Sequence, residues 1–157
     1  MTKAIPEGFN TITPSLVLKD AGAAIELYTK AFGATEEYRM NCPETGKVMH
    51  ACLNIGSSKL FLADEMPGCG SSTANSQFYL YVPDVDASVK KAASAGLEQT
   101  MAPEDMFWGD RLGNVKDKFG NSWTIATHKK DPSEAEMNTG RDEWMAKMKN
   151  AGSKKAA

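Results

Sequence analysis

The sequence is poor in the side chains that most catalytic and metal sites use. Its 157 residues include two histidines and three cysteines, and no two cysteines form a CxxC pair. An odd set of cysteines without that spacing argues against a disulfide framework and favours a reducing compartment. We expect Cys52, which lies in an apolar run, to be a small buried hydrophobic residue.

Long hydrophobic stretches and a large net charge are missing too. No apolar run reaches the roughly 18 residues that a membrane span needs, and residues 1–8 lack the apolar centre of a signal peptide. Eighteen Lys and Arg against twenty Asp and Glu leave a formal net charge of −2, so there is no basic field to attract nucleic acid. We expect a cytoplasmic protein with no membrane or nucleic-acid partner.

The stretch from Thr11 to Ala34 predicts a strand, a turn and a helix. Leu16 and Leu18 recur with the two-residue period of a half-buried strand over residues 13–19. Asp20 is placed to cap the helix that follows, because its carboxylate can accept from the N–H groups of the first turn. Gly33 is placed to end that helix in the left-handed conformation.

The same pattern returns 64 residues later. Leu80 and Asp84 repeat Leu16 and Asp20 at offsets of 80 − 16 = 64 and 84 − 20 = 64. The segment GSSKLFLAD from Gly56 also aligns with GNSWTIATH from Gly120, again at 120 − 56 = 64. Three matches in register indicate two copies of one supersecondary unit.

Each copy reads as strand, helix and three further strands. In module one, 11–64, the later strands are expected at 35–41, 47–55 and 59–64; in module two, 77–128, at 98–101, 112–117 and 122–128. A Gly- and Ser-rich linker, 65–76, separates the modules. Beyond a domain spanning 9–130, residues 131–157 predict a C-terminal helical tail that starts at a Ser133/Glu136 capping box and frays from Gly152.

Two βαβββ units in tandem resemble the vicinal-oxygen-chelate superfamily, which includes glyoxalase I, extradiol dioxygenases and bleomycin-resistance proteins. The segments IPEGF, LVLKDAGAAIELYTKAFGA, GKVMHA, FWGDR and FGNSWTIATHK, in that order, resemble its PhnB-like branch. The resemblance implies an α+β fold in which the modules form a curved mixed sheet around a cleft. It also implies a homodimer that takes a small-molecule ligand.

In that superfamily the metal ligands lie on the first and last strands of each module. Carried over with the 64-residue offset, those positions fall at Thr13, Leu60, Gln77 and Thr124. None of these side chains is a carboxylate or an imidazole, so nothing there offsets the cost of stripping water from a divalent cation. We therefore expect no metal and no other cofactor, and treat these four residues as ligand-binding candidates.

The two histidines are candidate acid/base groups. His128 shares the inward parity of Thr124, and Asp64 is its counterpart at the end of the first module, so the two predict a pair at the cleft rim. The alternative is that each is an ordinary solvated strand end. His50 lies in mid-strand, where a histidine of the core or of a dimer interface is the alternative to a catalytic one.

The segment 102–111 has an unusual composition for a loop. Phe107 and Trp108 offer aromatic faces, and Arg111 offers a planar fork suited to a carboxylate or phosphate, so we expect Trp108 and Arg111 to bind ligand. The alternative is that Trp108 plugs the end of the cleft while Arg111 pairs with Asp110 or Glu104. Tyr79 and Tyr81 alternate with Gln77 along one strand, so their side chains should point to the same face, toward the cleft. Trp123 should point to the opposite face of its strand and is expected in the core.

Three functions remain open at this stage. The first is a metal-free module that encloses a small, partly aromatic molecule, favoured by the uncharged cleft positions. The second is a metal-dependent lyase, isomerase or dioxygenase with non-standard ligands. The third is metal-independent acid/base catalysis through His50, Asp64, Glu65 or His128, and the fold by itself does not choose among them.

Overall fold

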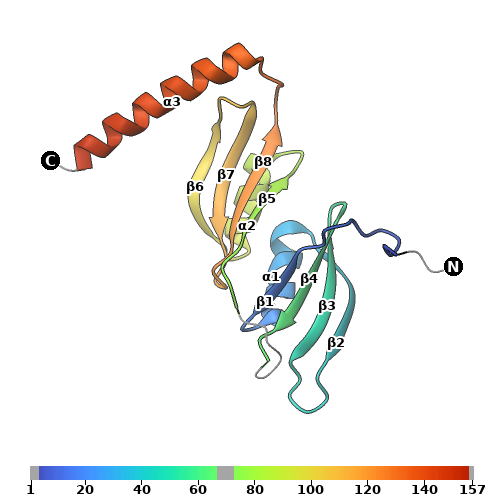
Figure 1. Cartoon of the computed structure of the whole chain (residues 1–157). Coiled ribbons are helices and arrows are strands. Elements are labelled where there is room, and N and C mark those ends of the chain that lie inside the picture. The colour runs from blue at the N-terminus through green and yellow to red at the C-terminus, as the bar shows by residue number, and fades with distance from the viewer. Residues whose placement is uncertain (1–3, 67–72, 156–157) are drawn as a thin grey trace.

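Two copies of one βαβββ unit follow each other along the chain, and a long helix ends it (Figure 1). The computed structural model describes residues 4–66 and 73–155. The first unit consists of β1 (Ser15–Leu18), α1 (Ala21–Phe32), β2 (Thr35–Asn41), β3 (Val48–Ile55) and β4 (Ser58–Asp64). The second consists of β5 (Gln77–Tyr81), α2 (Val85–Ser94), β6 (Glu98–Asp105), β7 (Asp110–Lys116) and β8 (Ser122–His128), and α3 (Glu134–Lys155) follows.

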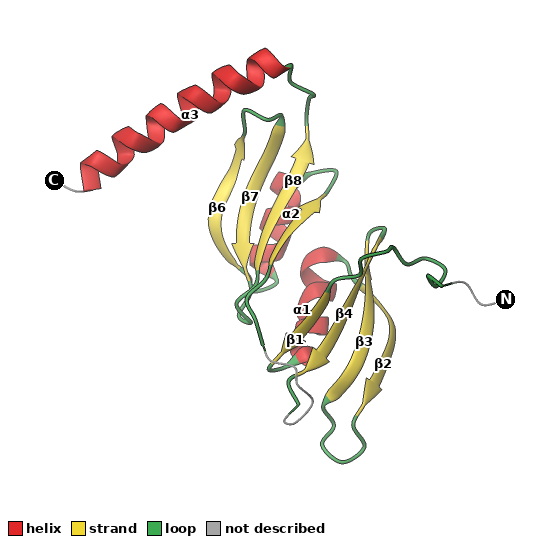
Figure 2. Cartoon of the chain, viewed as in Figure 1, coloured by secondary structure: helices red, strands yellow, loops and turns green. Residues whose placement is uncertain are grey.

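Each unit forms its own four-stranded mixed sheet. The strand orders are β1-β4-β3-β2 and β5-β8-β7-β6, and the first strand of each unit pairs in parallel with its last. Helix α1 covers one face of the first sheet and α2 one face of the second (Figure 2). We call the other face of each sheet, turned away from its helix, the open face. The duplicated α+β fold is confirmed, with two sheets rather than one.

The predicted helix ends are confirmed as well. Asp20 accepts a hydrogen bond from the Ala23 backbone N–H at 2.9 Å, and Gly33 ends α1 with φ of 67°. Asp84 accepts from the Ala87 backbone N–H at 3.0 Å in the same way. These caps satisfy N–H groups that the first turn of a helix leaves without a partner.

The segment expected to be a ten-residue loop is mostly strand. β6 extends to Asp105 and β7 begins at Asp110, which leaves a turn over residues 106–109. Pro103 is tolerated inside β6 because β6 is the edge strand of its sheet, where one N–H need not join a ladder. Asp110 and Arg111 therefore lie on a strand, and their side chains point to opposite faces of the sheet.

The register between first and last strands differs from the offset in the sequence. Leu16 pairs with Leu62 and Leu80 with Ile125, so the last strands correspond at 125 − 62 = 63 rather than 64. A shift of one residue sends every side chain of a strand to the other face. Leu60 accordingly packs in the core, 5% exposed, and its expected place in a cleft is wrong. Phe61 is the true counterpart of Thr124.

The two modules share one core, in which α1 packs against α2. Trp123 is 3% exposed and packs against the rings of Phe32 and Tyr28, at centroid distances of 4.4 and 5.1 Å. Its expected place in the core is confirmed. Cys52 is buried, as expected.

Helix α3 begins at the predicted capping box. The Ser133 N–H donates to Glu136 at 2.7 Å, and the Glu136 N–H donates to the Ser133 hydroxyl at 3.3 Å. The helix runs to Lys155, past Gly152, where we expected fraying to start. No helix of the described chain is both long and apolar enough to cross a membrane. Residues 67–72, in the centre of the expected linker, and residues 156–157 lie outside the described part.

Candidate functional site

A buried carboxylate organises the open face of the second sheet. Asp110, 4% exposed, accepts hydrogen bonds at Oδ2 from the hydroxyls of Tyr79 at 2.6 Å and Tyr81 at 3.0 Å. Its Oδ1 lies 2.8 Å from Nδ1 of His128. Three strands thus contribute to one cluster, which we call the Asp110 cluster: Tyr79, Tyr81, Asp110 and His128.

Strand pairing explains why these residues meet. Asp110 is the direct partner of His128 between β7 and β8. Tyr79 and Tyr81 lie two residues apart on β5, so both side chains point to one face, the face on which their β8 partners Thr124 and Ala126 also lie. The cluster is therefore a consequence of the sheet register and is held by rigid strands.

The cluster fixes the protonation of its members. Burial by itself would raise the pKa of the Asp110 carboxyl, but hydrogen bonds from Tyr79, His128 and Tyr81 outweigh it and lower that pKa. The pKa of His128 is raised by Asp110 and by Asp131, whose Oδ1 lies 3.0 Å from Nε2. Burial, and then the bond to Asp110, raise the pKa of Tyr79 to about 12. The tyrosines stay neutral donors, and the carboxylate stays ionised.

A second polar row crosses the same face. Tyr79, Thr124 and Asn114 are neighbours on β5, β8 and β7. The Asn114 amide nitrogen contacts the Met101 sulfur at 3.8 Å, whereas its Oδ1 is buried and has no hydrogen-bond partner among the described residues. Buried polar atoms normally have a partner. This row therefore holds one buried acceptor whose hydrogen-bonding capacity the described residues leave unused.

Trp108 lies beside this face in the turn between β6 and β7. It is half-buried and packs edge-on against Phe107 at a centroid distance of 5.0 Å. Its nearness to the Tyr79 side chain lowers the pKa of Tyr79, against the larger effects of burial and Asp110, which raise it. Gly109 has a φ of 95°, which supplies the left-handed conformation that the turn requires. Trp108 is thus brought to the Asp110 cluster.

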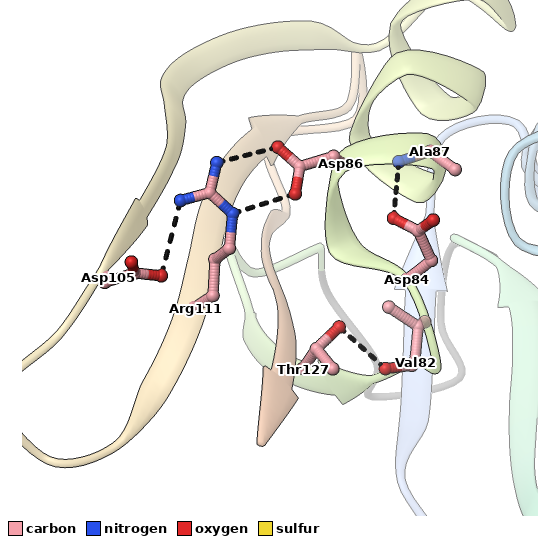
Figure 3. A network of polar contacts seen from close by, with 7 residues as sticks. All are labelled: Val82, Asp84, Asp86, Ala87, Asp105, Arg111 and Thr127. Carbon is pink, nitrogen blue, oxygen red and sulfur yellow. Dashed lines mark hydrogen bonds and ion pairs between the residues drawn. The ribbon is translucent and has the colours of Figure 1, made fainter. Parts of the chain in front are cut away.

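Arg111 is not brought there (Figure 3). It follows Asp110 on β7 and so points to the face covered by α2, where Nε and Nη2 donate to both carboxylate oxygens of Asp86 at 2.8 Å. Nη1 donates to Asp105 at 3.3 Å. Two carboxylates hold the guanidinium, and they are not those of Asp110 or Glu104, the partners expected from the sequence. The contact with Asp86 links α2 to the sheet.

The expected pair of Asp64 and His128 does not form. Asp64 lies in the other module, is 7% exposed, and accepts from the backbone N–H groups of Ala21 and Val48, each at 2.7 Å. The prediction is wrong because the one-residue difference in register turns Asp64 toward α1. Its role is to join β4, β3 and the start of α1.

His50 lies on the open face of the first sheet. Its Nδ1 is 2.9 Å from the hydroxyl of Tyr38, and its ring meets Phe61 edge-on at a centroid distance of 4.6 Å. It is half-buried among aromatic rings, away from the Asp110 cluster within the same chain. Neither a core nor a catalytic role follows from this position alone.

The positions that hold the metal in the family that this chain resembles carry poor ligands for a cation here. Thr13 is half-buried just before β1, Gln77 is exposed at the start of β5, Thr124 is half-buried, and Phe61 replaces Leu60 as the fourth position. Their donors are two hydroxyls and one amide, which is poor ligation for a dication. Nowhere in the described residues do three His, Cys, Asp or Glu side chains gather in a group that could hold a metal.

Sequence reasoning missed two members of the site. The sequence pattern places Asp110 in a loop, and nothing in it distinguishes Asn114 from its neighbours, whereas both residues lie on β7. The alternation of His128 with Thr124 does point to a site, because a histidine on that face at the end of a strand needs a hydrogen-bond partner from the adjacent strand. Finding that partner needed the β7–β8 register.

Comparison with known proteins agrees with this geometry. A model of the Glyoxalase/Bleomycin resistance protein/Dioxygenase superfamily matches residues 8–125. The chain belongs to this superfamily. The match covers both βαβββ units and stops before α3.

Individual relatives cover the same region. An uncharacterized protein of Mycobacterium bovis is 42% identical in an alignment of 123 positions that covers 73% of this chain and 80% of that protein. Among solved structures, TioX from a Micromonospora species is similar with a TM-score of 0.64 and 24% identity, covering 76% of this chain and 98% of TioX. An Arabidopsis thaliana gene product has a TM-score of 0.60 and 28% identity, at 75% and 98% coverage.

Proposed function

We propose that this superfamily member binds a small organic molecule over the open face of its second sheet, without a metal. The observation that carries the proposal is the buried Asn114 Oδ1 with no partner among the described residues. An unpaired buried acceptor costs about 1–3 kcal/mol, which an N–H or O–H of a ligand offsets. The ligand class is therefore a small molecule with a hydrogen-bond donor.

The tyrosines supply the apolar part of this site. Tyr79 and Tyr81 are 47% and 61% exposed, and their rings lie 5.1 Å apart, tilted by 47°. Because Asp110 anchors both hydroxyls, the rings lose little further freedom on binding. A flat aromatic body stacked on these rings, with its donor directed to Asn114, fits the arrangement.

A second copy of the chain is proposed to complete the site as a homodimer. Within one chain the open faces carry exposed large side chains, among them Met40 at 57% and Tyr81 at 61%. A ligand held only by such a face would keep one side in water. Pairing the open face of one copy with that of another would bury both and enclose the ligand.

An acid/base enzyme is a weaker candidate, although Asp110 and His128 lie at hydrogen-bond distance. Both ring nitrogens of His128 are held by carboxylates, which raises the pKa of the imidazole. A histidine with both ring nitrogens engaged in this way makes a poor general base. Its role in the proposal is to keep Asp110 ionised.

The binding proposal is tested with indole and indene, two bicyclic probes of similar shape of which only indole has an N–H. We expect indole to bind more tightly in calorimetric or NMR titrations, and Asn114→Leu to abolish that preference while retaining the side-chain volume. Asn138→Leu, at an exposed position of α3 away from both open faces, is the matched control and should keep the preference. Equal binding of both probes to the unaltered chain would refute the proposal.

A metal-dependent lyase, isomerase or dioxygenase is tested separately. The protein is purified with and without chelator, and its metal content and thermal midpoint are compared. Less than 0.1 equivalent of metal, on the order of background, and an unchanged midpoint are expected from the neutral donor set. About one equivalent of a transition metal with a lower midpoint after chelation would favour the enzyme instead.

A further inference from the structure

Helix α3 lies outside the region that the superfamily model matches. The family match ends at residue 125, and α3 spans Glu134–Lys155. Figure 1 shows the helix leaving the body, with its C-terminal end projecting beyond β6. No other helix or strand of the described chain packs along it. Because most helices in proteins owe their stability to tertiary packing of one face, a helix of this kind is expected to have a packing partner.

One narrow apolar stripe runs along α3. Met137, Gly140, Trp144 and Met148 follow each other at spacings of three, four and four residues, which places them on one side of a helix. The first part of the stripe is already used, since Gly140 lies so close to Phe107 that an added Cβ would collide with that side chain. The second part of the stripe has no such contact, since Trp144 is 47% exposed and Met148 is 55% exposed.

The exposed part of the stripe borders a hollow of about 520 Å³ between α3 and the turn after β6. Trp144 and Met148 line one side of it, and Met106 and Phe107 line the other. The hollow is large enough for bulky side chains, and the chain has side chains of that kind to offer in Trp144 and Met148 themselves. A second copy that approaches along a two-fold axis would insert the same residues.

Charge fixes the direction of such a pairing. Residues 134–143 carry four acidic side chains against Arg141, whereas residues 144–150 carry Lys147 and Lys149 and no acid. Two helices side by side in antiparallel orientation bring the acidic part of each against the basic part of the other, and a parallel pair would oppose like charges. The helix dipole also favours this distribution in a single helix, but it does not account for the exposed Trp144 and Met148.

We propose that α3 is a self-association helix. Two copies of the chain pair antiparallel about the level of residue 146, so that Trp144 of each copy packs on Met148 of the other. The same register places Glu143 of one copy near Lys147 of the other, because both residues lie on the same flank of the stripe and border the hollow. This interface is separate from the open faces of the sheets, so it stands or falls independently of the proposed ligand site.

Substitutions on the stripe test the apolar contact. The full chain is compared with Trp144→Glu, Met148→Glu and Ala146→Glu by sedimentation velocity over a range of concentrations. Ala146 is exposed on the opposite side of the helix and receives the same charge, so it is the matched control. The first two variants should associate at least about tenfold more weakly, which corresponds to about 1.4 kcal/mol, while the control associates as the unaltered chain does. Circular dichroism checks that each variant is folded.

A charge exchange tests the direction. Glu143→Lys and Lys147→Glu should each weaken association, and an equimolar mixture of the two variants should restore it, because the Glu143–Lys147 pairs across the helices are again of opposite sign. Because a dimer through the open faces would not involve α3, the two stripe variants are judged against Ala146→Glu. Association as strong as in that control, or an unaltered chain that is monomeric, overturns the proposal. A mixture that fails to restore association overturns the antiparallel register.

Discussion

The hydroxyl of Tyr28 on α1 donates to Oδ2 of Asp117, in the turn after β7, at 2.7 Å, and so joins the two modules in the core. Trp123 Nε1 and Asn121 Nδ2 donate to the same oxygen at 3.2 and 3.1 Å. Burial, and then the neighbouring Asp117 carboxylate, raise the pKa of Tyr28 well above its ordinary value. A buried carboxylate with this many donors fixes how α1 lies on the second module.

Removing the Tyr28 hydroxyl should therefore destabilise the whole chain. In Tyr28→Phe the ring stays, but Asp117 loses one donor in a buried place, and we expect the free energy of unfolding to fall by about 1–3 kcal/mol. Equilibrium unfolding in urea measures this. Tyr38→Phe removes an exposed hydroxyl that contacts His50 and should change stability far less; equal losses in both variants would contradict the role given to Tyr28.

The pair of His128 and Asp110 should make stability depend on pH in a defined window. The pKa of His128 is raised by Asp110 and Asp131, so its contribution is present below the unfolded value of about 6.5 and is lost as pH rises through the folded value. The pKa of Asp110 is lowered, so its contribution is present above about 3.9 and is lost as pH falls. The pair should stabilise most between about pH 4 and 6.5.

The difference in unfolding free energy between the unaltered chain and His128→Gln, followed from pH 3 to 9, measures this window. It should peak in the stated range and shrink on both sides. NMR titration adds a direct check, because Asp110→Asn should lower the pKa of His128 more than Asp131→Asn does. A difference that stays constant with pH would show that the pair does not couple.

Trp108 and Arg111, three residues apart, should respond differently to substitution. Trp108→Ala removes a side chain that touches Tyr79 beside the open face, so we expect indole binding to weaken several-fold with little change in thermal midpoint. Arg111→Lys loses the two-pronged contact with Asp86 on the α2 side, so indole binding should be unchanged. Titration calorimetry separates the two, and a large loss of stability in Trp108→Ala would instead mark that residue as structural.

The contact of Gly140 with Phe107 should control how α3 sits on the body. In Gly140→Ala the new methyl group meets the Phe107 side chain, so the start of α3 should move away even though alanine favours helix. Faster hydrogen exchange in the turn at 106–109, without loss of helix content, is the expected signature. The double variant Gly140→Ala with Phe107→Ala should reverse it, and failure to do so would place the cause elsewhere.

The sequence was sufficient where local chemistry decides the structure. Asp20, Gly33 and the Ser133/Glu136 box set helix ends through contacts within a few residues, and the returning leucine pattern revealed the duplication. Parity along a single strand also placed Trp123 correctly in the core.

What only the tertiary structure decided was how strands align with each other. The last strands of the two modules correspond at an offset of 63, so Leu60 and Asp64 point into the layer under α1. Phe61 is therefore the residue equivalent to Thr124 in the repeat. The β7–β8 register likewise brought Asp110 to His128, and the neighbouring β5 brought the tyrosines. The physical reason is the two-residue period of a strand: one residue of register, set by ladder hydrogen bonds and turn length, decides which face every side chain joins.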